Sequence, residues 1–119
     1  MKEKILFVNS CVRGENESRT LALAKTALSR LDGDIEEIRL ADANLKPLDA
    51  AGLAKRAESA EKNDFSDPVY DCAKQFAACD TVVVAAPFWD YSFPSILKIY
   101  IESLCVGGLT FLYGSDGVP

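Results

Sequence analysis

Two short runs of apolar, largely β-branched residues constrain the fold most strongly, because each is followed by a loop and a helix-like segment. They are KILFVN at residues 4–9 and TVVVAA at residues 81–86. Their length and composition predict strands inside a sheet, and the second run predicts a strand buried on both faces. Strands joined through helices pair in parallel by right-handed crossovers. The sequence therefore predicts an α/β fold with a parallel sheet.

The segments between and after these runs continue the alternation of strands and helices. Apolar residues recur at helical spacing, and Gly or Pro marks several ends. The elements expected in addition are helices at residues 19–31, 50–63 (mostly exposed), 69–79 and 94–105, an edge strand at residues 34–40, and a short extended segment at 109–113 before a turn-like stretch at 114–119. Together they make three βα units of a three-layer, doubly wound sheet with strand order 2-1-3.

The number of units is small for such a sheet. A doubly wound sheet usually has five strands, and at about 30 residues for each unit it needs roughly 150 residues. The run at 81–86 suits a central strand, yet the sequence supplies one neighbour for it, and a bare apolar edge invites aggregation. We therefore expect residues 1–119 to form one domain that is incomplete at its C-terminus: a truncated product, a fragment, or a protein that completes its sheet with another chain.

Charge and composition exclude several classes of function. The net charge of −5 disfavours binding to nucleic acid or anionic lipid. No apolar run approaches the ~20 residues of a membrane span, and the first residues lack a signal-peptide pattern, so we expect a cytoplasmic protein. The chain has no His and four scattered Cys, which argues against a zinc site and against hydrolases with a Ser–His or Cys–His pair.

The loop after the first strand carries groups that suit a phosphate. It leads from a buried strand into a helix, where backbone N–H groups and the helix dipole favour anions. Neither GxGxxG nor GxxxxGK[ST] occurs, which disfavours a dinucleotide fold or a P-loop. The alternative is that Ser18 is only a helix cap and the arginines are solvated. The candidate side chains are Ser10, Asn16, Ser18, Thr20, Arg13 and Arg19.

The loop after the run at 81–86 is unusually aromatic and holds the only Trp of the chain. Open α/β sheets bind ligands beyond the carboxyl ends of their strands, where the strand order reverses. A 2-1-3 order would place this loop beside the first one. A flat heteroaromatic ring needs flat apolar surfaces of this kind, although a hydrophobic plug or a dimer contact would use them too. The residues are Phe88, Trp89, Asp90 and Tyr91.

Two stretches, KILFVNSCVRGENESRTLALA and TVVVAAPFWDYSFPSILKIYIESLCVGGLTFLY, resemble the FMN-dependent NADH-azoreductase and NAD(P)H:quinone reductase family of flavodoxin-like proteins. The likeness runs over essentially the whole chain and stops where the family continues into its last two strands. The resemblance implies a flavodoxin-like fold and an FMN site. The family's FMN-phosphate loop matches Ser10, Asn16, Glu17 and Ser18. The family's flavin-ring segment matches Phe88, Trp89, Asp90 and Tyr91.

The resemblance also implies an activity. Hydride would pass from NAD(P)H to FMN and then to a small aromatic acceptor, a quinone or an azo compound, in a homodimer whose active site lies across both subunits. Asp90 stands where the family usually has Asn, and an ionised carboxylate accepts hydrogen bonds without donating. The family's third, glycine-containing flavin segment has no counterpart in the chain. Alternatives are a flavodoxin-type electron carrier and an inactive fragment that persists as a multimer.

Overall fold

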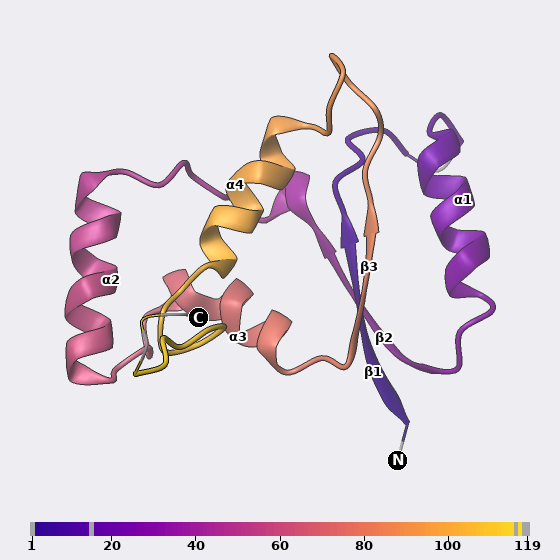
Figure 1. Cartoon of the computed structure of the whole chain (residues 1–119). Coiled ribbons are helices and arrows are strands. Elements are labelled where there is room, and N and C mark those ends of the chain that lie inside the picture. Colours follow the sequence, from indigo (N-terminus) through magenta and orange to yellow (C-terminus); the bar gives the residue numbers. More distant parts are fainter. Residues whose placement is uncertain (1, 15, 116, 118–119) are drawn as a thin grey trace.

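The computed structural model describes residues 2–14, 16–115 and 117. The sheet has three parallel strands in the order β2-β1-β3, which are β1 (Glu3–Asn9), β2 (Gly33–Arg39) and β3 (Thr81–Ala85). The helices are α1 (Arg19–Leu28), α2 (Ala50–Lys62), α3 (Asp71–Ala77) and α4 (Ser95–Leu104). Helix α1 covers one face of the sheet, and α3 and α4 lie on the other (Figure 1). The predicted parallel sheet, its strand order and its three layers are confirmed.

Strand β1 is the centre of the core, because its alternating side chains point to both helical layers. On one face Ile5 and Phe7 are buried against α1. On the other face Leu6 and Val8 are buried against α4. The α1 side of the core includes Leu21, Ala24 and Leu28, and the α4 side includes Leu97, Tyr100 and Leu104. The two loops that follow β1 and β3 therefore leave from a fixed platform.

Strand β3 differs from the prediction that it is buried on both faces. Its first three residues are half-buried, and Val84 is 47% exposed. The reason is that β1 is the only strand paired with β3 in the described sheet, so its other edge is open. An apolar groove of about 590 Å³ runs between this open side and α4, and Val84, Ile101 and Phe111 are among its lining residues.

The boundaries of several other elements also differ from the sequence prediction. Helix α1 ends at Leu28, because the amides of Arg30 and Leu31 donate to the carbonyl oxygens three residues back instead of four. The helix expected at 69–79 is a 3₁₀ turn (Pro68–Tyr70) followed by α3. Residues 109–113 form no strand and share a single bridge, Gly107 with Phe111.

Two further predictions are settled by exposure. Helix α2 has no buried residue among those described, as expected for an exposed helix. Strand β2 is mostly exposed and lies at the other edge of the sheet, also as expected.

No helix in the described part of the chain is long and apolar enough to cross a membrane. Within the predicted loops, Glu15, Asp116, Val118 and Pro119 lie outside the described residues.

Candidate functional site

The carboxyl ends of β1 and β3 are tied together by one residue. Ser10 is 1% exposed, and both its amide (3.0 Å) and its hydroxyl (2.6 Å) donate to the carbonyl oxygen of Ala85. The loop that leads into α1 and the aromatic loop after β3 therefore start side by side, as the predicted strand order requires (Figure 1).

The loop into α1 ends in a capped helix start. Ser18 has an extended backbone, and its hydroxyl accepts a hydrogen bond from the amide of Leu21 at 3.1 Å. The amides of Glu17 and Ser18 both donate to the carbonyl oxygen of Gly14 at 3.0 Å, which folds the loop back on itself. The positive end of the α1 dipole faces the space in front of this turn.

One pocket of about 290 Å³ joins the two loops. The first loop and the start of α1 contribute Cys11, Val12, Arg13, Glu17, Ser18, Arg19 and Thr20, and the aromatic loop contributes Pro87 and Trp89. Two guanidinium groups at a helix N-terminus can bind a phosphate through two-pronged hydrogen bonds. Trp89 adds a flat apolar wall. The pocket therefore suits an anion that is attached to a flat ring.

The aromatic loop is a tight two-residue hairpin. The amide of Trp89 donates to Ser92 at 2.7 Å and the amide of Ser92 donates back at 2.8 Å. The central residues Asp90 (φ 49°) and Tyr91 (φ 65°) both have positive φ, as in a type I′ turn. Asp tolerates this conformation, but it is unusual for a bulky residue such as Tyr. The two hydrogen bonds between Trp89 and Ser92 hold the loop in this conformation.

The rings of this hairpin point outward. Phe88 is 75% exposed and Tyr91 is 94% exposed, and the two rings meet edge to face with centroids 6.3 Å apart. Exposed aromatic surface beside a pocket is available to a ligand or to another protein chain.

The structure separates the eight predicted site residues into two groups. Glu17, Ser18 and Trp89 line the pocket. The other five lie outside its lining: Ser10 is buried beneath it, while Asn16, Phe88, Asp90 and Tyr91 are exposed. Pro87, which lines the pocket, was not among the predicted site residues, although its place directly before the aromatic tetrapeptide was a signal for it.

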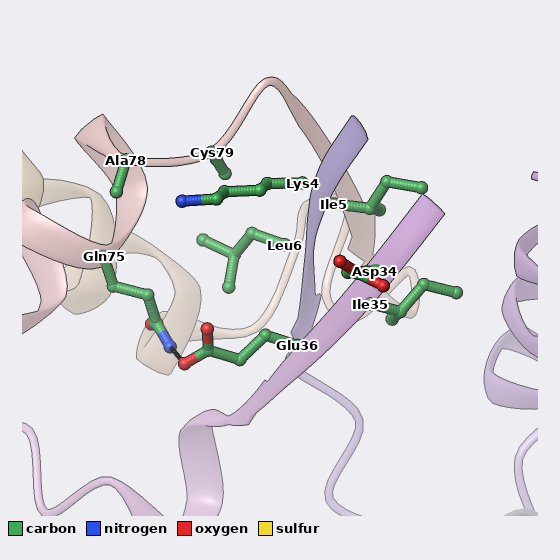
Figure 2. A pocket seen from close by; sticks show the side chains of 9 residues that line it. All are labelled: Lys4, Ile5, Leu6, Asp34, Ile35, Glu36, Gln75, Ala78 and Cys79. Carbon is green, nitrogen blue, oxygen red and sulfur yellow. Dashed lines mark hydrogen bonds between the residues drawn. The ribbon is translucent and has the colours of Figure 1, made fainter. Parts of the chain in front are cut away.

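Another pocket, of about 350 Å³, lies at the opposite end of the sheet, at the start of β1 and β2 and the end of α3. Figure 2 shows the amine of Lys4 extending into it and a hydrogen bond, 2.6 Å long, from Gln75 to Glu36. The amino ends of parallel strands are not where open α/β sheets bind their ligands. The pocket at the carboxyl ends is therefore the candidate functional site.

The chain is an open, doubly wound α/β domain, and the pocket lined by Arg13, Arg19 and Trp89 lies where its strand order reverses. The family described as "Flavodoxin-like fold" matches residues 3–119, and the chain belongs to this family.

Curated relatives and solved structures agree with this assignment. The chain is 31% identical to the "FMN-dependent NADH:quinone oxidoreductase" of Clostridium perfringens, over 96% of this chain and 60% of that protein. It is 36% identical to the "FMN-dependent NADH:quinone oxidoreductase 2" of Clostridium acetobutylicum, over 96% and 59%. An FMN-dependent NADH-azoreductase from Bacillus anthracis, solved in complex with FMN, superposes with a TM-score of 0.74 at 22% identity, over 97% of this chain and 61% of that one.

The chain spans about 60% of the length of the curated relatives it matches. The similarity to the Bacillus anthracis structure, at 22% identity, shows a common fold.

Proposed function

We propose that this chain binds FMN in the pocket between its two loops and acts in the NAD(P)H-dependent reduction of quinones or azo compounds. One observation carries the proposal: Arg13 of the first loop, Arg19 at the start of α1 and Trp89 of the distant aromatic loop line the same pocket. The names of the relatives, FMN-dependent NADH:quinone oxidoreductase and azoreductase, support it.

The phosphate of FMN fits the end of the pocket formed by the first loop. Arg13 and Arg19 would neutralise the phosphate, and the hydroxyls of Ser18 and Thr20 can donate to its oxygens. Among the described residues that line this pocket, Glu17 is the one acidic group, so they set two guanidinium groups against one carboxylate.

The ring system fits the end formed by the aromatic loop. Pro87 and Trp89 would pack against the apolar faces of the ring system. The backbone N–H and C=O groups of the hairpin would form hydrogen bonds with its polar edge. Asp90 is held there with its carboxylate on the surface, where it would disfavour negative charge on the ring edge.

Bound FMN would supply the hydride chemistry, so no catalytic acid or base is required of the chain. The chain's own part is to bind the phosphate, orient the ring and offer aromatic surface to the acceptor. Phe88 and Tyr91 are exposed beside the pocket and suit a flat quinone or azo compound. We also propose that a second copy of the chain covers these rings in a homodimer, because exposed aromatic patches favour association.

The experiment is reconstitution. Purified chain is mixed with FMN, passed through a desalting column and examined for visible flavin absorption, then mixed with NADH and a quinone. The proposal expects retained flavin and quinone-dependent oxidation of NADH. Retained flavin without NADH oxidation would favour an electron carrier, and a colourless protein would contradict FMN binding.

A further inference from the structure

Three hydrogen bonds connect α1, β2 and β1 to Cys11. This residue lines the pocket and belongs to the loop between β1 and α1, which is called the phosphate loop below. Lys25 Nζ of α1 donates to Glu37 Oε1 of β2 at 3.1 Å. Asn9 Nδ2, at the end of β1, donates to the other carboxylate oxygen, Glu37 Oε2, at 3.2 Å. The backbone amide of Cys11 donates to Asn9 Oδ1 at 3.0 Å.

Asn9 is the central member of this network. It is 2% exposed, so both ends of its amide must find partners inside the protein. The Cys11 amide is a donor and requires the oxygen end of the Asn9 side chain. The nitrogen end then points at Glu37 and requires an acceptor. The carboxylate of Glu37 thus selects the one orientation of Asn9 that holds the loop.

Glu37 keeps its charge in this position. Desolvation raises the pKa of its carboxyl, but the hydrogen bonds from Asn9 and Lys25 and the charges of Lys25 and Arg39 outweigh that effect and lower the pKa overall. A charged acceptor binds the Asn9 amide more strongly than a neutral one.

Cys11 is where the network reaches the pocket. It is 4% exposed, packs in the core beneath α1 and also lines the pocket. Its amide fixes the path on which the backbone leaves β1 toward Arg13. Glu37 itself is not among the residues that line the pocket.

We propose that Glu37 is a positioning residue for the phosphate loop and acts through the side chain of Asn9. The inference rests on the proposed function, in which this loop binds the phosphate of FMN. A simple surface ion pair between Lys25 and Glu37 would contribute to stability alone, and little to that.

The test compares FMN with riboflavin, which has the same ring and no phosphate. Glu37→Ala should raise the Kd for FMN by about tenfold, the size expected for the loss of a charge-assisted hydrogen bond, and change the Kd for riboflavin by less than about twofold. Glu37→Gln keeps an acceptor for Asn9 and should restore most of the FMN affinity. Glu36→Ala is the matched control, because Glu36 is the neighbouring residue and bonds to Gln75 on the other face of the sheet (Figure 2).

A second readout does not depend on flavin. Hydrogen exchange of the Cys11 amide should become about tenfold faster in Glu37→Ala, as expected for a lost hydrogen bond, and stay unchanged in Glu36→Ala. Equal loss of FMN and riboflavin in Glu37→Ala, or unchanged exchange at Cys11, would overturn the positioning role. A wild-type chain that binds neither flavin would overturn the proposed function, and this inference with it.

Discussion

The hydroxyl of Ser10 donates a 2.6 Å hydrogen bond to the carbonyl oxygen of Ala85, which joins the first residue after β1 to the last residue of β3. Two segments 75 residues apart in the sequence are thereby held at the carboxyl end of the sheet. The position of the pocket follows from this contact, because both of its walls begin there.

Ser10→Ala tests the contact. The hydroxyl hydrogen of Ser10 is committed to Ala85, so removal of the hydroxyl should lower the free energy of unfolding by about 1 kcal/mol. The amide of Ser10 still donates to the same oxygen, which limits the loss. Urea unfolding measures it. Unchanged stability would show that the hydroxyl does not hold the two strand ends together.

Ser18→Asp separates the role of a helix cap from that of a phosphate ligand. Asp caps a helix as well as Ser does, so the free energy of unfolding should change by less than about 0.5 kcal/mol. FMN should bind at least about fivefold more weakly, because two like charges about 4 Å apart repel by about 1 kcal/mol even in water. Ser18→Asn, a neutral cap, is the control. Equal weakening by both substitutions would contradict phosphate binding at Ser18.

Tyr91 has the left-handed backbone that favours glycine. Tyr91→Gly should therefore be more stable toward urea than Tyr91→Ala by about 1 kcal/mol, the cost of a Cβ in this conformation. Both substitutions remove the ring, so both should reduce turnover of a quinone by the reconstituted protein. Equal stability of the two variants would mean that the hairpin does not keep its positive φ in solution.

The buried Tyr100 side chain should make the protein less stable at alkaline pH. It is 2% exposed, and its hydroxyl has no hydrogen-bond partner among the described residues. Burial, with smaller effects of Cys72 and Cys79, raises its pKa far above the usual value. The unfolded chain loses this proton above about pH 10 and the folded chain does not, so stability should fall as the pH rises past that value.

Tyr100→Phe should make this fall smaller, and the remaining fall comes from Cys72 and Cys79, because burial also raises the pKa of their thiols. Its stability at pH 8 should equal that of the wild type or exceed it, because the substitution deletes an unpaired buried hydroxyl. Urea unfolding at pH 8 and pH 10.5 measures both effects. Tyr113→Phe is the control, since Tyr113 is 66% exposed. The same alkaline fall in both variants would rule out Tyr100 as its source.

The fold was predictable from the sequence because the runs at 4–9 and 81–86 and the helical spacing between them are local signals. The exposure of Val84 was not, since it depends on which strands lie beside β3 and not on the composition of β3. The early end of α1 at Leu28 was missed because Leu31 fits the helical period, although it is 41% exposed.

The site was only partly predictable for a similar reason. The charge, hydroxyl and aromatic ring of Arg13, Ser18 and Trp89 can be recognised from the sequence as ligand-binding groups. The predicted strand order is enough to bring these residues together. Asn9 and Glu37 were missed because their roles arise from hydrogen bonds between separate strands. A polar Asn at the end of an apolar run was the one sequence signal for that network.

FMN binding between the two loops can be measured through the single tryptophan of the chain, which lines the pocket. FMN is titrated into the protein while the fluorescence of Trp89 is recorded, and riboflavin is titrated in parallel. An FMN site between the two loops predicts saturable quenching by FMN, with riboflavin requiring at least about tenfold higher concentration because it lacks the phosphate. Quenching that rises linearly without saturation, equally for both flavins, would contradict an FMN site between the two loops.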